Sequence, residues 1–479
     1  MISEAHGCVP EIAAVALFAE TAGSSLFSHA SPVIQANIIY SGTFTTPAPG
    51  WKEKVSRGEL TAGRIYDPEA PGQTLAGDQT LWRAGEQLAR VKPDDRKIYF
   101  PEFSVAQSVA EPLADRHGNR IVGNGTTRSF SGVLDHYPVL VSSLRIHDDR
   151  EHFTDRFVDT LRGNFNGTGT INRVTGEWTV TFEQPPRRNL PIKGDYSYYN
   201  LSGRLQEFTA VNITNSMLGL TDEFVRPSGY THDLNADGRF DEVDGDWLVE
   251  WVRGFNRPAS HRVKEWLLGP IDHSSPALMV PPGYPLWYFG SQVIDSERES
   301  YDTFRRRHED RDSVIFVGSR DGMLHAFDAG KFRHGDNPET TEIRENRGYF
   351  LWEPRTDDSP AYCADHLEKC PNYGTGAELW AFIPANLVPR LKNSRLKADE
   401  QAFVNASPSL ADVFIDTNGD GVEDTWRTVL LSSEGDGGDS VFCLDVTDPR
   451  RPQFLWEFAA PEFFRNRPSP TAVQIGRTL

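Results

Sequence analysis

Two acidic segments of the chain combine the residue types and the spacing that a hard metal cation requires. The first, residues 416–424, reads DTNGDGVED. Calcium takes about six to eight oxygen ligands, and a loop that coils around the ion turns every second side chain inward. The oxygen-bearing positions are Asp416, Asn418, Asp420, the carbonyl of Val422 and Asp424. We therefore predict a calcium site here, with a turn rich in Asp and Asn that binds no metal as the alternative.

The second segment, residues 233–244, reads DLNADGRFDEVD and has the complete ligand spacing of an EF-hand loop. Its ligand positions hold Asp233, Asn235, Asp237, the carbonyl of Arg239, Asp241 and Asp244. Gly238 occupies the position where such a loop turns sharply. Aspartate replaces the longer glutamate at the last position, so we expect weaker binding than in a standard loop. An acidic loop without metal is the alternative.

Each loop needs elements that hold its two ends. Short apolar runs at residues 411–415 and 426–431 flank the first loop and predict two strands, so this loop would close a β-hairpin. Residues 246–254 follow the second loop with a helical pattern, as in the second half of an EF-hand.

No constellation of residues predicts catalysis. His273 and His325 are isolated histidines for which the sequence places no partner carboxylate, so structural roles are favoured over general-base roles. Asp321 and Gly322 are expected to form a hairpin turn. The sequence also has no vicinal cysteine pair and no Gly-rich phosphate loop. We therefore expect that the protein is not an enzyme.

The composition describes an acidic, folded chain. Its 479 residues are 24% charged and 38% hydrophobic, as is usual for globular proteins. A formal net charge of -19 repels phosphate backbones, which argues against nucleic acid as a partner. No apolar run reaches the ~18 residues of a membrane span, and the longest, residues 12–19, follows no basic segment and is no convincing signal peptide. Either an upstream segment directs export, or the chain is cytoplasmic.

The cysteines bear on the compartment. Cys363 and Cys370 enclose a short polar loop, and a disulfide between them would suit an exported protein. A metal site that also uses His366 is the alternative, with only three ligands visible. Cys443 lies in an apolar run and is expected to be buried.

Changes in the pattern of apolar and turn-forming residues divide the chain into four regions. We expect an N-terminal remnant with a short helix and strands over residues 1–100, and an inserted antiparallel β-domain over 101–225. An EF-hand-like loop with its helix follows over residues 226–259, and a series of blade-like strands over 260–479. Helical patterns occupy residues 11–22 and 81–90, and the clearest hairpin joins residues 168–172 to 177–182.

The last region predicts a mainly β fold with a partial β-propeller. Short strands with Gly and Asp turns recur at residues 314–318, 322–328, 378–384, 429–433, 440–446 and 454–458. Trp380 and Trp456 are expected to pack between neighbouring blades. Each blade needs ~40–50 residues, so the region holds only about four or five, and we expect an incomplete propeller.

Four motifs of this region carry a family resemblance. They are DHSSP at residues 272–276, VGSRDGMLHAFDA at 317–329, ELWAFIP at 378–384 and FCLDV at 442–446. In this order they resemble the C-terminal propeller of the PilC/PilY family of type IV pilus tip-associated proteins. Residues 247–254 also look like the segment that leads into the propeller of that family.

The resemblance implies a non-enzymatic calcium-binding component of type IV pilus biogenesis, adhesion and motility. It implies export to the pilus tip, the outer membrane surface or the extracellular space. It also implies minor pilins and the pilus machinery as partners, with host or surface ligands as further ones. The calcium loop of the family propeller corresponds to residues 416–424.

Two other functions remain open. The blades also resemble those of quinoprotein dehydrogenases, which use calcium with a quinone cofactor. A metal in such an enzyme needs open coordination positions, whereas the segment 416–424 would surround its ion with its own oxygens. The remaining alternative is a calcium-stabilised surface scaffold without a role in the pilus.

Overall fold

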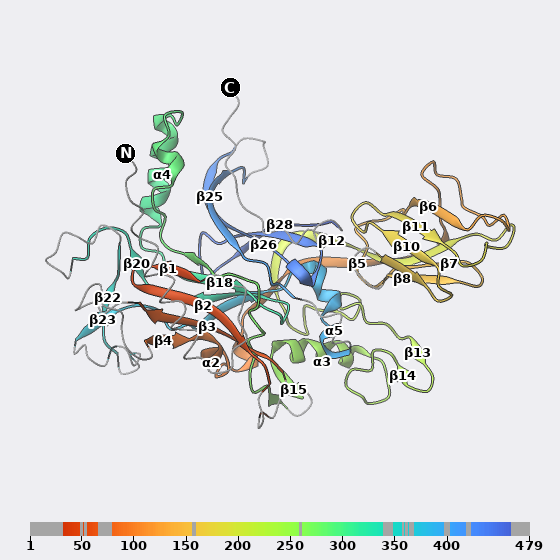
Figure 1. The fold of residues 1–479 in the computed structure, drawn as a ribbon, viewed down its shortest axis with the longest axis horizontal. Helices are drawn as coiled ribbons and strands as arrows, with labels where there is room; N and C mark the ends of the chain where they lie inside the picture. The colour runs from red at the N-terminus through yellow and green to blue at the C-terminus, as the bar shows by residue number, and fades with distance from the viewer. Residues whose placement is uncertain are drawn as a thin grey trace, which may run out of the picture.

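A computed structural model shows a mainly β fold, as the sequence predicts (Figure 1). It describes residues 32–460 apart from 48–50, 52–54, 66–78, 156–159, 258–260, 339–347, 357–358, 360–362, 364–367, 397–402 and 418–422. The α-helices are α2 (Ala84–Leu88), α3 (Glu242–Arg253), α4 (Asp295–Arg307) and α5 (Asn393–Leu396). Short 3-10 helices occur at η1 (Pro93–Asp95), η3 (Leu286–Phe289), η5 (Ala385–Arg390) and η7 (Gly435–Gly437). Among the residues described, no helix combines the length and apolar character needed to cross a membrane.

Three sets of four antiparallel strands form the body of the molecule, and the second set continues through β5 (Ile98–Pro112) and β12 (Lys193–Glu207) into a 12-stranded sheet. The first set is β1 (Val33–Gln35), β2 (Ile38–Thr45), β3 (Arg57–Arg64) and β4 (Thr80–Arg83). The second is β17 (Ala277–Met279), β18 (Val314–Gly318), β19 (Leu324–Asp328) and β24 (Glu378–Phe382). The third is β25 (Ser409–Ile415), β26 (Thr425–Ser433), β27 (Ser440–Asp445) and β28 (Gln453–Ala459). Most of the last region's predicted strands are therefore confirmed, although β26 begins four residues before its predicted start and other ends shift by one or two residues.

The second set is buried on both faces. Along β18, Ile315 packs in a core shared with the first set, whereas Phe316 packs in a core shared with the third set. Alternate side chains of a strand point to opposite faces, so a strand covered on both sides needs an uninterrupted apolar run. This explains the sequence VIFVG of β18, in which every residue is buried. Trp380 is fully buried in the same core, but Trp456 is 43% exposed, so its expected packing between blades is wrong.

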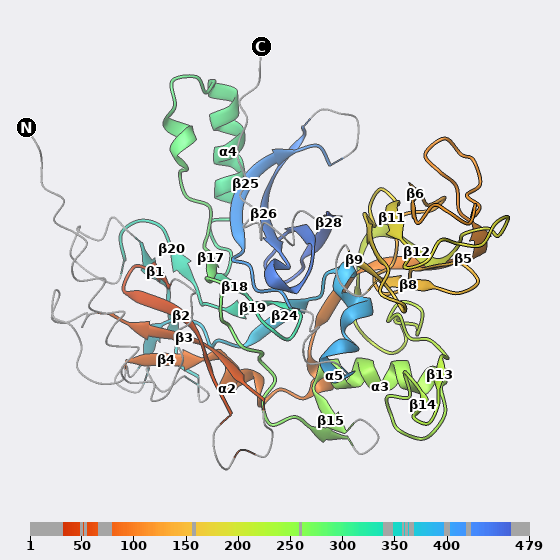
Figure 2. The same ribbon diagram turned by 45° about the vertical axis from the view of Figure 1, so that its right-hand side comes forward.

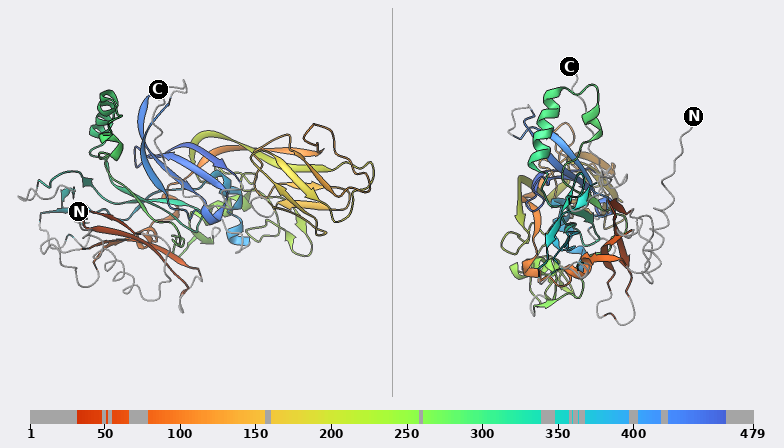
Figure 3. Two further views of the ribbon diagram at one scale, coloured as in Figure 1. Left: turned by 45° about the horizontal axis from the view of Figure 1, so that its top comes forward. Right: turned by 90° about the vertical axis from the view of Figure 1, so that its left-hand side faces the viewer.

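A long two-stranded ribbon leads out of the body. Its strands are β5 (Ile98–Pro112) and β12 (Lys193–Glu207), and β5 also pairs in parallel with β24. At its far end lie β6 (Ser129–Val133), β7 (Arg145–His147), β8 (His152–Asp155), β9 (Thr160–Gly163), β10 (Thr168–Ile171) and β11 (Glu177–Thr181). This part, called the arm here, has its own core around Phe153, Trp178 and Phe182. It extends away from the three sheets (Figures 1 and 3).

Shorter elements connect these parts. Two-stranded ribbons pair β13 (Phe224–Val225) with β14 (Gly229–Tyr230), β15 (Phe255–Arg257) with β16 (Arg262–Val263), β20 (Phe332–Arg333) with β21 (Tyr349–Phe350), and β22 (Trp352–Pro354) with β23 (Lys369–Pro371). Cys363 and Cys370 form a disulfide with their Cα atoms 5.7 Å apart, and Cys443 is buried, as predicted.

Two helical expectations differ from the structure. The helix predicted at residues 81–90 is replaced by the end of β4 and the short α2, because Trp82 pairs with Ala62 of β3. Helix α4 was not expected; it stands beside the hairpin of β25 and β26 (Figure 2). There Trp287 stacks on Trp426 with ring centroids 5.4 Å apart. The helical pattern at residues 11–22 lies outside the described residues.

Candidate calcium loops and a buried ionic network

Three predicted ligands of the loop of residues 233–244 form hydrogen bonds with backbone N–H groups of the same loop. The Asp233 carboxylate accepts the N–H groups of Asp237 at 3.0 Å and Gly238 at 2.8 Å. The Asn235 side-chain oxygen accepts the Asp237 N–H at 2.9 Å, and Asn235 also donates to the Asp237 carboxylate at 3.2 Å. Gly238 has a φ of 86°, a left-handed backbone that glycine adopts without strain. Asp233, Asn235 and Asp237 are thus brought together around one tight turn.

The last two ligand positions of this loop also begin helix α3. Asp241 is the N-cap residue, and its carboxylate accepts the Val243 N–H at 3.0 Å. The carboxylate of the buried Asp244 accepts the Asp241 N–H at 3.0 Å and the Leu234 N–H at 2.7 Å. These bonds form a capping box, which fixes the start of the helix and holds the two ends of the loop together. The helix predicted after the loop is confirmed, and it begins earlier, at Glu242.

The donor set of this loop fits a hard cation. Its side chains offer only oxygens as ligands, and Asp233, Asp237 and Asp241 place three carboxylates within a few residues. Like charges this close are unfavourable without a counter-ion. No group of three or more His, Cys, Asp or Glu side chains is gathered closely enough to hold a metal anywhere in the described ranges. The ligand assignment therefore stays a prediction.

The loop of residues 416–424 is described only at its two ends. Asp416 directly follows β25, and Asp424 directly precedes β26, so the predicted hairpin is present. The Thr417 hydroxyl donates to the Asp424 carboxylate at 2.8 Å. The Asp424 N–H donates to the Ile415 carbonyl at 3.0 Å, which continues the pairing of the two strands. The other predicted ligands, Asn418, Asp420 and the Val422 carbonyl, lie outside the described residues.

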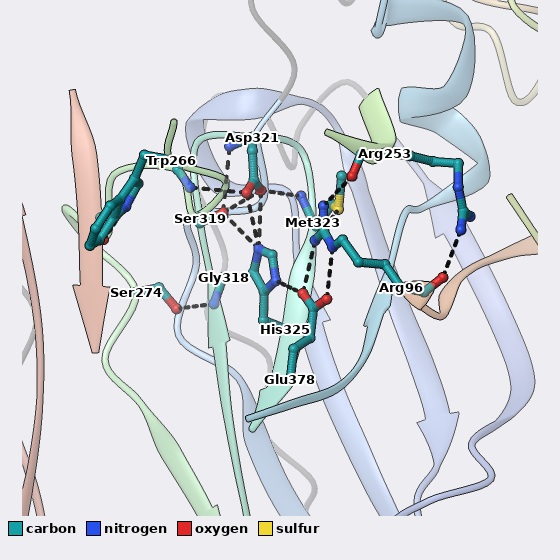
Figure 4. A network of polar contacts seen from close by, with 12 residues as sticks. Arg96, Arg253, Trp266, Ser274, Gly318, Ser319, Asp321, Met323, His325 and Glu378 are labelled. Carbon is teal, nitrogen blue, oxygen red and sulfur yellow. Dashed lines mark hydrogen bonds and ion pairs between the residues drawn. The ribbon is translucent and has the colours of Figure 1, made fainter. Parts of the chain in front are cut away.

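A buried ionic network surrounds His325, and no pattern in the sequence predicts it (Figure 4). The imidazole Nδ1–H donates to the Glu378 carboxylate at 2.8 Å, and Nε2–H donates to the Asp321 carboxylate at 3.2 Å. Glu378 also accepts two hydrogen bonds from the Arg96 guanidinium, both at 2.9 Å. Arg96 in turn donates to the carbonyl of Arg253 at 3.0 Å, at the end of α3. The network therefore joins β19, β24, the end of α3 and the short segment between η1 and β5.

Electrostatics keep all members of this network charged. Burial alone would lower the pKa of the His325 imidazole, but the charges and hydrogen bonds of Asp321 and Glu378 raise it to about 9. Burial would likewise raise the pKa of the Asp321 carboxyl, but His325 lowers it to about 2. The pKa of the Glu378 carboxyl also falls to about 2, because the attraction of Arg96 and the hydrogen bonds from His325 and Arg96 outweigh burial.

This arrangement is unsuited to nucleophilic catalysis. The Ser319 hydroxyl lies 3.1 Å from His325 Nε2, the distance expected of a nucleophile and its base. However, an imidazole that donates from both nitrogens has no lone pair to accept the serine proton. The Ser319 hydroxyl donates instead to the Asp321 carboxylate. Ser319 and His325 are both completely buried, so substrate has no access. His273 is paired with Asp272 at 3.1 Å near the surface.

A second buried ion pair fastens the arm to the third sheet. Arg173, in the turn between β10 and β11, contacts both carboxylate oxygens of Asp439 at 2.6 and 2.7 Å. The Asn386 amide donates to the same carboxylate at 2.8 Å. Arg173 and Asp439 are 266 positions apart and carry no local motif, so only the fold reveals the contact.

The comparisons with known proteins point in one direction. No family model matches the chain. It is 29% identical over 468 residues to the type IV pilus biogenesis factor PilY1 of Pseudomonas aeruginosa strain PAO1, covering 90% of this chain and 33% of that protein. It is 27% identical over 404 residues to a PilY1 homolog of Xylella fastidiosa strain Temecula1, covering 82% of this chain and 25% of the homolog. The chain thus spans about a third or less of the length of these relatives.

One solved structure is also similar in sequence. It is the crystal structure of the Pseudomonas aeruginosa PilY1 C-terminal domain, with 27% identity, a TM-score of 0.20, and coverage of 38% of this chain and 25% of that chain. The chain is therefore similar along most of its length to type IV pilus biogenesis factors, and the resemblance to the PilC/PilY family that its motifs indicate is confirmed.

Proposed function

We propose that this protein is a non-enzymatic, calcium-binding component of type IV pilus biogenesis that acts at the pilus tip or the cell surface. The observation that carries the proposal is the similarity to PilY1 across 90% of the chain. A role in adhesion and motility, with minor pilins and the pilus machinery as partners, extends this proposal. The disulfide between Cys363 and Cys370 supports export, because such bonds persist in oxidising compartments.

The three sets of four strands are proposed to be neighbouring blades of a partial propeller. They follow one another in the sequence, apart from the arm and the loop of residues 233–244, and each is an antiparallel meander. The cores between the first and second sets and between the second and third sets support this arrangement, because propeller blades pack face to face.

The pilus role is tested by genetics in the source bacterium. Deletion of the gene is expected to reduce surface pili and twitching motility, and the wild-type gene restores both. Affinity purification of the chain from the same cells is expected to recover minor pilins. Normal piliation and motility in the deletion strain, with no pilin recovered, would reject the proposal.

Calcium is proposed to bind the loop of residues 233–244 through Asp233, Asn235, Asp237, the Arg239 carbonyl, Asp241 and Asp244, and the loop of residues 416–424 through Asp416, Asn418, Asp420, the Val422 carbonyl and Asp424. When bound, the ion would neutralise the clustered carboxylates. In the first of these loops it would connect the turn at Gly238 to the capping box of α3, since Asp241 and Asp244 belong to both.

Calcium addition and removal provide the corresponding test. A ligand that binds only the folded state stabilises it by about 2.7 kcal/mol at a hundredfold excess over its dissociation constant. We expect the parent protein to melt at a higher temperature in calcium than in chelator. Asp237→Ala and Asp420→Ala should each remove part of this difference, because each deletes a charged ligand.

The matched control is Asp222→Ala, since this exposed aspartate lies outside both loops. It should retain the full calcium response of the parent. Calorimetry with Ca²⁺ gives an independent count of sites. A parent whose melting is the same in calcium and in chelator would rule out calcium binding, and it would leave the pilus role to be decided by the genetics.

A further inference from the structure

A polar cavity of about 470 Å³ lies where the chain after α4 meets the turn between β27 and β28. His308, Arg311 and Asp312 line it from the first segment, Arg427 from β26, and Asp448 and Arg451 from the turn. Every residue that lines the cavity except Pro449 has a polar or charged side chain. Ligand pockets usually have mostly apolar walls, so this one suits a small polar ligand rather than an apolar one.

The acidic residues of the cavity are largely matched by arginines. Arg427 pairs with Asp445 at 3.1 Å, and Arg450 pairs with Asp312 at 2.7 Å. Asp310 is paired with an arginine outside the cavity, Arg333, at 3.2 Å. After these pairs are formed, the guanidinium groups of Arg311 and Arg451 and the carboxylate of Asp448 remain.

Arg311 and Arg451 have no carboxylate within ion-pair distance in the part of the chain that the structure describes. The Arg311 guanidinium donates to the Val280 carbonyl at 2.7 Å and to the Thr428 hydroxyl at 2.7 Å, both neutral groups. Burial lowers the pKa of Arg311 to about 10, despite the nearby charge of Asp412. The pKa of the His308 imidazole is also lowered, by burial and then by its arginine neighbours. The cavity therefore offers a ligand two guanidinium groups that have no carboxylate partner, beside the carboxylate of Asp448.

The turn that carries Arg451 is firmly held. The Arg451 N–H donates to the Asp448 carbonyl at 3.1 Å, with proline next to Asp448, as is favoured in a β-turn. The carbonyl of Pro449 accepts the indole N–H of the buried Trp380 at 2.8 Å. This anchor fixes one wall of the cavity, and a wall that is already ordered loses less entropy on binding.

We propose that this cavity binds a small hydroxylated organic anion of the class of carboxylated saccharides. Its carboxylate would meet the guanidinium groups of Arg311 and Arg451, because charge-assisted hydrogen bonds from arginine to a carboxylate are stronger than neutral ones. Its hydroxyls would be held by Asp448 and Thr447, which also line the cavity. The site is separate from both predicted calcium loops, and it does not depend on the pilus role.

Titration calorimetry of the full chain tests the proposal, with sodium glucuronate as the probe and glucose as its neutral counterpart. We expect saturable binding of glucuronate and none of glucose. Arg451→Gln should weaken glucuronate binding by about tenfold or more, because a charge-assisted contact is lost. Its side chain is exposed, so folding should be unaffected, and matching melting curves will verify this. Arg188→Gln, at an exposed arginine of the arm, is the matched control and should bind like the parent.

Two further measurements separate saccharide recognition from simple anion binding. Asp448→Asn should weaken glucuronate binding, because this carboxylate is assigned to a hydroxyl group. Inorganic phosphate should bind more weakly than glucuronate. The proposal is wrong if glucuronate does not bind at about 10 mM, a concentration that detects even weak sites. It is equally wrong if Arg451→Gln binds like the parent, or if phosphate binds as tightly as glucuronate.

Discussion

At the residue scale, the imidazole of His325 is the most informative group, because it donates to carboxylates from both nitrogens. Its pKa is about 9 in the folded protein and about 6.5 in an unfolded chain. A raised pKa means that this stabilisation is fully present below about pH 6.5 and is lost as the pH rises through 9. We predict that His325→Gln lowers the free energy of unfolding most below about pH 6.5, by on the order of 3 kcal/mol, with the gap narrowing toward pH 9.

The measurement is chemical denaturation of parent and variant between pH 6 and 9.5, a range set by those two pKa values. His273→Gln is the control, since the side chain of His273 is 43% exposed, unlike the buried imidazole of His325. It should cause only a small change in the free energy of unfolding. A gap between parent and His325→Gln that stays constant with pH would mean that the imidazole is not charged in the folded protein.

Residue-level reasoning from the sequence succeeds where partners are close in the chain. The segment 233–244 can be identified from spacing alone, because ligands of one loop recur at fixed offsets. The partners of His325 could not be found in this way. Glu378 is 53 positions from His325 and 282 from Arg96, and no periodicity relates them. The close approach of these side chains exists only after the sheets have paired.

At the element scale, the turn between β10 and β11 makes the buried contact between Arg173 and Asp439. Their side chains are 5% and 2% exposed. Removing one partner of a buried pair leaves an uncompensated charge, which typically costs about 3–5 kcal/mol. We predict that Arg173→Gln lowers the free energy of unfolding by this amount, measured by chemical denaturation. The double variant with Asp439→Asn should lose less free energy of unfolding than the sum of the two single variants.

A surface ion pair of the arm provides the control for these variants. Arg187 and Asp149 are 2.8 Å apart, but the arginine side chain is 64% exposed. Arg187→Gln should therefore cost less than about 1 kcal/mol. If Arg173→Gln is no more destabilising than Arg187→Gln, the arm is not held by this contact.

The helices and strands differ in how well the sequence predicts them. Strands β18 and β27 were predicted within one or two residues, because strands covered on both faces have continuous apolar runs. Helix α4 was missed because its sequence, DSERESYDTFRRR, is dominated by charges and buries only Tyr301 and Phe304. Those two residues pack against Trp426 of β26, a contact that no local pattern predicts. The apolar face of α4 therefore becomes recognisable only once its packing partner is known.

At the scale of the whole molecule, the arm and the body have separate hydrophobic cores. The core of the arm is built from residues between Leu113 and Tyr198, and none of its members belongs to the cores of the three sheets. One residue of the same stretch, Leu140, packs in the core of the body instead. Val105 and Tyr199 face each other across the ribbon just outside this range. The ribbon could therefore be closed there by an Asn-Gly turn, the two-residue connection that suits paired antiparallel strands.

We predict that replacing residues 106–198 with Asn-Gly, together with Asp439→Asn, leaves the body folded. The second change is needed because deletion of Arg173 would otherwise leave the Asp439 carboxylate buried without its partner. Calorimetry should show that the body retains a cooperative transition, at a temperature lowered by the loss of Leu140 from its core, while the heat absorbed by the arm disappears. The same deletion without Asp439→Asn should melt at a lower temperature. Loss of cooperative unfolding in both shortened chains would mean that the body cannot fold without the arm, whatever the separation of their cores.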